Sequence, residues 1–436
     1  MSTALTDDHT PPGTPASPTA TAPPTATAPA TAPATATAPA TARADAAGTG
    51  TGTGTDAPPR WRRVARALRW LYGWLLIGAA VLWLAYTLVR RAVTGRWHWS
   101  LLLDAVPPVL LVAAPLLLAV AGVAACGPRR RWVVALALAG ILPGLDQTGV
   151  NLHALRWGTP EVPPGAVHVV TWNTNYWGMS NSDPLAQLRF LKRQNADVYL
   201  LQEHVIWVPG TGEVGYYPIQ DDDRLRAEFP GYHIARRSEL VTISRYPILA
   251  TPVFGPAAQV PPGAPFRDVF ARDKVLRTDL LIGGRTVSVY NVHVTVQTAI
   301  DINLFGRDVD TDAYYRRKFA WRRAEIQGLV DDVKANPNPS VISGDFNATS
   351  AMGELDRVRE VARDATPASR QLLPLSWRFD APMNFRWDNP LAGLPLPFWR
   401  IDWTFTRGPL TVHRYEITSA ESLSDHRPQQ LWFSPA

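Results

Sequence analysis

Polar residues that could bind a metal ion or a phosphate group follow several short apolar runs in the second half of the sequence. The runs with their polar ends read TWN, LLQE, NVH, SGDFN, RID and SDH, and they contribute Asn173, Glu203, His293, Asp345, Asn347, Asp402, Asp425 and His426. One such residue at a strand end is usually a turn former or a satisfied hydrogen-bonding group. Six endings drawn only from Asn, Asp, Glu and His indicate a shared site, because ligand sites in layered α/β folds gather where strands end.

These residue types favour one kind of reaction. Carboxylate and amide oxygens suit a hard cation such as Mg²⁺ or Mn²⁺, whereas zinc prefers several cysteines or a histidine trio, and the chain has a single cysteine. Histidines can hydrogen-bond a phosphoryl oxygen, and an aspartate behind one of them would fix its tautomer. Asp345 and Asn347, two residues apart on an extended segment, present both side chains on one face and could orient a water. Metal-assisted hydrolysis at phosphorus is therefore the predicted chemistry.

Residues 166–436 carry the pattern of an α/β domain that would position these residues. Runs rich in β-branched and aromatic residues predict strands at 167–172, 198–202, 240–244, 275–282, 286–294, 340–343, 401–406, 412–417 and 429–433. Gly283-Gly284 between two of these runs predicts a hairpin. Helical stretches interleave near 183–194 and 312–334. Strands mixed with helices predict two packed sheets covered by helices.

The N-terminal part of the chain has a different composition. Residues 1–58 consist almost entirely of Thr, Ala, Pro, Gly and Ser, which predicts a disordered tail. The formal net charge of +6 arises within residues 1–165, and the remainder of the chain is neutral. Nucleic-acid binding draws most of its affinity from basic side chains that neutralise phosphates, so the neutral domain makes nucleic acid a less favoured partner.

Residues 59–150 are predicted to form a membrane anchor with three transmembrane helices. Apolar runs occupy about 70–89, 101–126 and 132–150, and about 20 apolar residues span a bilayer core. Prolines inside the second run are compatible with a membrane helix. The third run is the least apolar, because Asp146 lies near its end.

The arginines predict how this anchor is oriented. Three spans place the arginines of Arg60–Arg69 and Arg129–Arg131 on one side and leave only Arg90, Arg91 and Arg96 near the other. Basic residues are enriched on the cytoplasmic side of membrane proteins. The sequence thus predicts a multi-pass plasma-membrane protein whose catalytic domain lies outside the cytoplasm. Without the third span, that domain would face the cytoplasm.

The strand-end motifs together resemble a known series. TWNT, LLQEH, NVHV, ISGDFNAT, RIDWTF and SLSDHRP, in this order, resemble the signatures of the endonuclease/exonuclease/phosphatase superfamily. The resemblance covers about 166–433 and implies a four-layer αββα sandwich, preceded here by transmembrane helices. The combination with three N-terminal spans is also similar to bacterial membrane proteins associated with glycopeptide (teicoplanin-type) resistance. That narrower resemblance implies action outside the cell on lipid-linked intermediates.

The superfamily resemblance implies a metal site and an activated water. Glu203 would be the principal metal ligand, with Asn173 beside it and Asp425 close to the metal. Asp345 and Asn347 would position and activate the attacking water. The expected cofactor is Mg²⁺ or Mn²⁺.

The same resemblance implies two histidines at the scissile phosphate. His426, paired with Asp402, would contact the phosphate, and His293 would help to stabilise its developing charge. Asn175 stands where several nucleases of the superfamily carry an acidic residue, which weakens the case for a second metal.

Three functions are compatible with these features. The first is a membrane-anchored phosphohydrolase or phosphodiesterase acting on a phosphate ester or diphosphate of a lipid-linked substrate, with the bilayer as its partner and no obligate protein partner. The second is a membrane-anchored nuclease, which the neutral charge of the domain disfavours. The third is a non-catalytic phosphate-binding module, which would not need the whole catalytic set. The expected function is the first.

Overall fold

The computed structural model describes residues 59–125, 127–158, 161–178, 183, 185–208, 215–297, 310–378, 397–421 and 423–436. The described residues all belong to the second of two compact units, Pro59–Ala436. The tail predicted for residues 1–58 lies outside the described residues.

A first six-stranded sheet runs in the order β15-β16-β1-β2-β6-β5. Its strands are β1 (Val167–Asn173), β2 (Val198–Gln202), β5 (His233–Arg237), β6 (Leu240–Ser244), β15 (Leu410–Ile417) and β16 (Gln429–Pro435). β1 and β2 are parallel, and the remaining neighbours are antiparallel. β1 buries side chains on both faces, and valines and a tryptophan supply most of them.

A second six-stranded sheet runs in the order β11-β14-β10-β9-β8-β7. Its strands are β7 (Ile248–Ala250), β8 (Val275–Ile282), β9 (Arg285–His293), β10 (Ser340–Asp345), β11 (Arg363–Asp364) and β14 (Asp402–Arg407). β9 and β10 are parallel. The predicted Gly283-Gly284 hairpin joins β8 to β9, and both glycines have positive φ (57° and 78°), which a tight turn of this kind requires. Two short ribbons pair β3 (Val205–Trp207) with β4 (Tyr216–Pro218) and β12 (Trp377–Arg378) with β13 (Pro397–Trp399).

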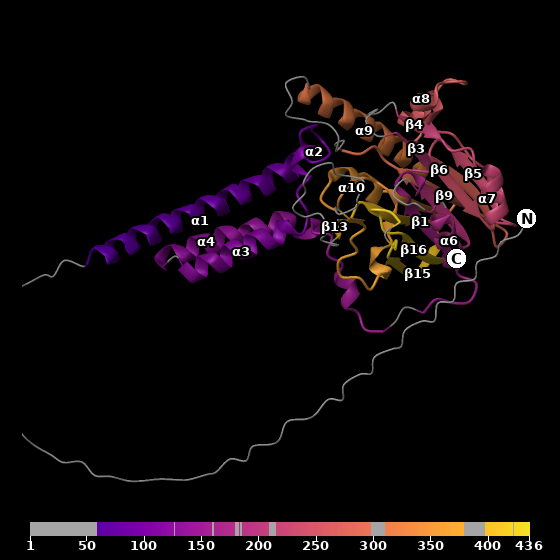
Figure 1. Ribbon diagram of the computed structural model, residues 1–436. Coiled ribbons are helices and arrows are strands. Elements are labelled where there is room, and N and C mark those ends of the chain that lie inside the picture. The colour runs from indigo at the N-terminus through magenta and orange to yellow at the C-terminus, as the bar shows by residue number, and fades with distance from the viewer. Residues whose placement is uncertain are drawn as a thin grey trace, which may run out of the picture. The chain divides into compact units, whose positions relative to one another are not determined.

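Helices cover the outer faces of both sheets (Figure 1). The described helices of this part of the chain are α5 (Asn175–Gly178), α6 (Ala186–Gln194), α7 (Asp222–Glu228), α8 (Phe266–Arg272), α9 (Thr311–Ala335) and α10 (Gly353–Arg359), with 3-10 turns η5 (Gly255–Gln259) and η6 (Thr366–Ala368), and α6, α7, α9 and α10 pack on the sheets. One apolar core, which includes Val169 and Val289, lies between the sheets. A second core joins α6 and α7 to the first sheet, and a third joins α9 and α10 to the second sheet. The predicted α/β class with two packed sheets and covering helices is confirmed.

The region before the sheets is helical. It consists of α1 (Arg60–Val93), α2 (Ser100–Leu103), α3 (Leu110–Ala125), η1 (Gly127–Arg129), α4 (Arg130–Ile141), η2 (Leu142–Gln147) and η3 (Leu152–Leu155). α4 packs against both α1 and α3, so the three helices lie side by side (Figure 1). Among the described residues, α1 is the one helix long and apolar enough to cross a membrane by length and composition.

The second and third predicted spans differ from the helices that form. The run at 101–126 is interrupted after α2, because Pro107 and Pro108 lack backbone N–H donors, and α3 begins only at Leu110. The run at 132–150 is α-helical only to Ile141 and continues as the 3-10 helix η2. Among the described residues, the structure therefore has one helix long and apolar enough to span a membrane and one shorter apolar helix, α3, in place of three full spans.

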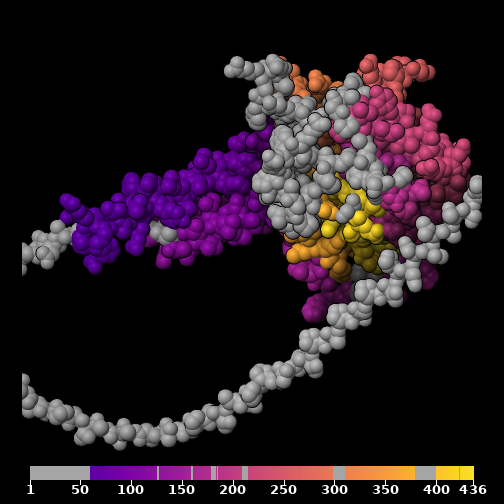
Figure 2. Space-filling model, viewed as in Figure 1, coloured from indigo at the N-terminus to yellow at the C-terminus, as the bar shows by residue number. Residues whose placement is uncertain are grey.

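The surface of these helices is apolar. Only 22% of the most apolar stretch of α1 is buried, whereas the core helix of a soluble protein is mostly buried. Large apolar side chains with more than half of their surface exposed include Leu75, Leu82, Leu117 and Val120. Figure 2 shows the outer surface of α1, drawn in indigo, beside the purple α3 and α4, with the colours giving residue number. Large exposed apolar surfaces mark sites of contact with a membrane or with another protein.

Candidate active site

The strand topology brings the predicted polar residues to one end of both sheets. β1 and β2 end at Asn173 and Gln202, which are register partners, and Glu203 follows β2 directly. In the second sheet, Asp345 at the end of β10 is the register partner of both His293 and Asp402. Neighbouring strands thus place three of the predicted residues in one row. His426 precedes β16, which is antiparallel to β1, and so lies at the same end as Asn173.

Asn173 connects carboxylates that come from the two sheets. Its Nδ2 donates to Glu203 Oε1 at 3.1 Å and to Asp345 Oδ2 at 3.0 Å. Its Oδ1 accepts from the Asn175 N–H at 3.0 Å, and the Tyr176 N–H donates to Glu203 Oε2 at 3.2 Å. Burial raises the pKa of Glu203 to about 7, and the neighbouring Asp425 and Glu239 add to the rise against the opposing effect of His293 and His426. A buried carboxylate in this setting favours a bound cation.

The backbone around Glu203 and Asn173 is strained. Among the described residues, eight non-glycine residues have positive φ, and five of them are at this site: Asn175, Tyr176, Trp177, Glu203 and Asn347. Such conformations cost free energy and persist where the surrounding structure requires them. The Tyr176 N–H contact to Glu203 depends on this local backbone, so the strain directs a donor at the predicted metal ligand.

His426 and Asp402 form the predicted pair. His426 Nδ1 lies 3.0 Å from Asp402 Oδ2, and both side chains are buried. The Asp402 N–H donates to Ser376 Oγ at 3.1 Å, and the His426 N–H donates to Ser424 Oγ at 3.0 Å, which fixes both residues. Burial lowers the pKa of His426, but the carboxylates of Asp402, Asp345 and Asp425 raise it well above its usual range. These carboxylates therefore favour the charged form of the imidazole.

His293 has a carboxylate partner that the sequence did not reveal. Its Nδ1 lies 3.0 Å from Glu239 Oε1, and Glu239 is fully buried and also accepts a hydrogen bond from Lys274 Nζ. Burial opposes the charged form of His293, but Glu239 raises the pKa of the imidazole overall. Glu239 directly precedes β6, and because β6 is antiparallel to β2, the start of β6 lies beside the end of β2. The sequence feature that could have indicated Glu239 is a charged residue directly before an apolar strand.

Asp345 lies between the two histidines. Its Oδ2 is 3.7 Å from His293 Nε2 and 3.7 Å from His426 Nε2. Its Oδ1 accepts from the Asn347 N–H at 2.7 Å, and Asn347 Nδ2 lies 3.3 Å from Oδ2. Burial raises the pKa of Asp345, against the opposing effect of the histidines. A carboxylate with a raised pKa accepts a proton more readily near neutral pH.

Asp425 is held at the edge of this cluster. Trp377 Nε1 donates to Asp425 Oδ2 at 2.9 Å, and Ser424 Oγ lies 3.4 Å from Oδ1. Asp425 also contributes to the raised pKa values of Glu203 and His426, which places its charge near both. Its predicted place close to a metal, like the roles of Glu203 and Asn173 as ligands, stays a prediction.

The donor set fits a divalent cation. Asp345, Asp402 and His426 each offer a ligand atom, and these atoms lie within 4.8 Å of one another. Glu203 is joined to this group through Asn173. Asp402 already pairs with His426 Nδ1, so Glu203 stays the predicted principal ligand and Asp345 the carboxylate predicted to face the water. Oxygen donors of this kind match Mg²⁺ or Mn²⁺.

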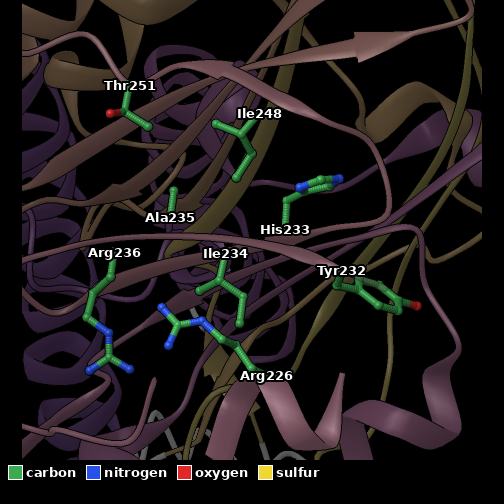
Figure 3. Close-up of a pocket in the computed structure, with 8 residues that line it drawn as sticks. All are labelled: Arg226, Tyr232, His233, Ile234, Ala235, Arg236, Ile248 and Thr251. Atoms are coloured by element: carbon green, nitrogen blue, oxygen red, sulfur yellow. The ribbon is translucent and has the colours of Figure 1, made fainter. Parts of the chain in front are cut away.

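A cavity of about 490 Å³ lies away from this cluster (Figure 3). It is lined by residues of α7, β5 and β7 and of their flanks, among them Arg226, Arg236 and Ile248. None of its lining residues belongs to the strand-end cluster. The chemistry of the strand-end residues, and not the size of this cavity, identifies the candidate active site.

Comparison with known proteins agrees with this architecture. The model of the endonuclease/exonuclease/phosphatase family matches residues 170–426. The match begins in β1 and ends at His426, so it includes every strand-end residue described above. The comparison with curated proteins found no match to this chain.

Several solved structures are similar to part of the chain. An endonuclease/exonuclease/phosphatase from Beutenbergia cavernae is 16% identical with a TM-score of 0.41 and covers 62% of this chain and 72% of its own. Truncated TDP2 of Caenorhabditis elegans is 18% identical with a TM-score of 0.39, and the match covers 63% of this chain and 99% of the TDP2 chain. A mannosyl-6-phosphatase from Bacteroides thetaiotaomicron is 15% identical with a TM-score of 0.38, and the match covers 62% of this chain and 99% of the phosphatase chain.

Proposed function

This chain belongs to the endonuclease/exonuclease/phosphatase family, whose members hydrolyse phosphoester bonds, and we propose that it is a membrane-anchored, divalent-metal-dependent phosphohydrolase or phosphodiesterase. Its proposed substrate is a lipid-linked phosphate ester or diphosphate outside the cytoplasm. The observation that carries the proposal is the convergence of two histidines on one carboxylate. Both Nε2 atoms lie 3.7 Å from Asp345 Oδ2, while each Nδ1 faces a separate buried carboxylate.

This geometry suits attack of water on phosphorus. Asp345 and Asn347 would orient the water, and Asp345 would accept its proton. His426 and His293, each oriented by its carboxylate, would donate hydrogen bonds to phosphoryl oxygens as negative charge develops there. Preorganised donors in a buried site stabilise such charge better than water does.

The residue that would hold the metal is Glu203, with Asn173 and Asp425 beside it, whereas Asp345 would face the water. A bound Mg²⁺ or Mn²⁺ supplies Lewis-acid stabilisation of the phosphoryl oxygens. Asn173 turns its amide nitrogen to both carboxylates and its oxygen to the Asn175 N–H. Direct ligation by Asn173 would therefore require its amide to rotate.

We extend the proposal to a three-helix membrane anchor. α3 has 16 residues, or about 24 Å at 1.5 Å per residue, which is shorter than a bilayer core of about 30 Å. The Arg129 guanidinium lies over the rings of Trp70 and Trp74, at 5.6 and 5.2 Å from their centroids. The arginines that start α1 and those before α4 are therefore near the same end of the bundle. This arrangement supports a cytoplasmic N-terminus and an external catalytic domain.

A fusion experiment tests this topology. A reporter that is active only in the cytoplasm, fused after Ala436, should be silent, and the same reporter fused within residues 1–58 should be active. A strongly active C-terminal fusion would show that the catalytic domain faces the cytoplasm. The proposed phosphoester hydrolysis would be unaffected by that result.

The lipid-linked substrate is proposed from anchoring. A tethered site meets membrane-bound substrates at a high effective concentration. The sequence resemblance to glycopeptide-resistance membrane proteins, which rests on three N-terminal spans, would imply the same substrate class. Purified full-length protein in detergent with Mg²⁺ should hydrolyse a polyprenyl diphosphate or a sphingomyelin-like diester faster than it nicks plasmid DNA. Plasmid nicking as the fastest reaction, with no lipid turnover, would replace this function with that of an anchored nuclease.

A further inference from the structure

A buried polar cluster lies where the N-terminal helices meet the catalytic domain. We name it the junction cluster and define it by Arg90, Thr94, Asp104 and Gln147. All four side chains are buried, and Arg90 and Asp104 are each only 1% exposed. Charged side chains are rarely buried to this degree unless they are paired with groups of opposite charge or with hydrogen-bond partners.

The junction cluster is held together by its own hydrogen bonds. Arg90 Nη1 donates to Asp104 Oδ1 at 3.1 Å, and Thr94 Oγ1 donates to Asp104 Oδ2 at 2.7 Å. Arg90 Nη2 also donates to Gln147 Oε1. The cluster thus joins the end of α1 to the turn before α3 and to the end of η2.

The same residues bind the segment that follows the catalytic Asp345. Arg90 Nη1 donates to the Ala351 carbonyl at 2.8 Å, and Thr94 Oγ1 accepts from the Gly353 N–H at 2.9 Å. Ser350 Oγ donates to the Gln147 carbonyl at 2.6 Å. The backbones approach closely here, because a Cβ on Gly353 would lie 2.7 Å from the Thr94 carbonyl oxygen.

This segment, which we name the catalytic loop (345–353), is also held from the domain side. Gln297 Nε2 donates to the Asn347 carbonyl at 2.9 Å and contacts Met352 Sδ at 2.8 Å. Trp403 Nε1 donates to the Ala348 carbonyl at 2.7 Å. Asp345 and Asn347 therefore begin a loop whose far end is bonded to the helices of the proposed anchor.

We propose that the junction cluster positions the catalytic loop, so that the N-terminal helices are a structural part of the active site and not only a tether. Arg90 and Thr94 would act as positioning residues through the backbone of Ala351 and Gly353. The effect of this positioning on turnover is measured with phosphoester hydrolysis, so that part of the test rests on the function proposed above. Displacement of catalytic groups by about 1 Å can lower a rate by about 10²-fold, so loss of these contacts should be visible in turnover.

Two variants of the full-length protein test the proposal, with a matched control. Arg90→Gln removes the buried charge, and Thr94→Val removes the hydrogen bonds of the Thr94 hydroxyl while keeping the shape of the side chain. Arg91→Gln is the control, because Arg91 lies next to Arg90 on α1 but pairs with Asp146 in an ion pair of which both partners are exposed. Turnover is measured on bis-p-nitrophenyl phosphate, a soluble probe that needs no membrane.

Arg90→Gln and Thr94→Val should lower kcat about 10- to 100-fold with little change in KM, whereas Arg91→Gln should match the wild type. Hydrogen exchange supplies a readout that is independent of activity. Amides of residues 346–353 should exchange at least about 10-fold faster in both variants than in Arg91→Gln, while amides of β1 and β2 stay unchanged.

The outcomes separate this inference from the proposed function. If Arg90→Gln fails to fold, Thr94→Val decides. Unchanged exchange at 346–353 in Thr94→Val would overturn the inference, as would lowered thermal stability with wild-type kcat. If the wild type hydrolyses no phosphoester, the proposed function fails, but faster exchange of the catalytic loop would still establish its coupling to the junction cluster.

Discussion

The two histidines of the candidate site have different electrostatic surroundings. His426 faces Asp402, and three carboxylates raise its pKa well above the usual range. His293 faces Glu239, whose charge is shared with Lys274, and Lys274 opposes the charged form of His293. The comparison indicates that His426 is the more firmly charged donor. Two similar histidine–carboxylate pairs can therefore contribute unequally to one reaction.

The largest effect is expected from His426→Ala. Loss of a charged, oriented donor should lower turnover by about 10²–10⁴-fold. The substitution leaves Asp402 buried without its partner, and breaking a buried ion pair lowers the free energy of unfolding by about 3–5 kcal/mol. Thermal unfolding of the variant should therefore be measured together with its turnover, to show that the protein assayed is folded. His413→Ala, on β15, is the matched control and should retain activity. Near-normal turnover in folded His426→Ala protein would contradict the assignment.

His293→Ala is expected to have a smaller effect, near the lower end of that range, at about 10²-fold. The reason is the Lys274 charge, which leaves His293 less firmly protonated. The measurement is kcat on the same substrate and at the same pH as for His426→Ala. A larger loss in His293→Ala than in His426→Ala would reverse the comparison.

Glu239→Gln sharpens the comparison through stability. It leaves Lys274 buried without its carboxylate and should destabilise the fold by about 3–5 kcal/mol. Turnover should fall by about 10–100-fold, as for other groups that orient a functional histidine. Adding Lys274→Met should restore much of the stability in denaturant unfolding but not the turnover. Recovery of both would mean that Glu239 serves only the fold.

Asp402→Asn should have the smallest effect, about 10-fold, because the imidazole remains and loses only its anionic partner. Combined with His426→Ala, the substitution should have almost no further effect, since both act through one group. Kinetics of the double variant measure this. Losses that multiply would show that the two residues act independently.

The sequence predicts the site well where the information is local. The strands at 198–202 and 240–244 form as predicted, and the polar residues at strand ends meet because parallel neighbours end at the same edge. Glu239 was missed because it starts a strand antiparallel to β2, and only the pairing of β6 with β2 brings it to the site. The position of Lys274 beside Glu239 depends on the same tertiary arrangement.

The N-terminal helices were less predictable. Hydropathy merges 101–126 into one span, although Pro107 and Pro108 divide it and Asp104 pairs with Arg90. The Arg90–Ala351 contact links residues 261 positions apart, and no local pattern reports it.

The central claim is metal-dependent phosphoester hydrolysis at the strand-end cluster, and a Mg²⁺ titration of turnover in wild type and Glu203→Gln tests it most directly. The wild type should lose activity in a chelator and regain it with Mg²⁺ or Mn²⁺. Glu203→Gln should require a far higher Mg²⁺ concentration, because a neutral amide replaces a carboxylate of the same size. Glu228→Gln, which removes a surface partner of Lys192, should titrate like the wild type. Full activity of Glu203→Gln in a chelator would contradict the account.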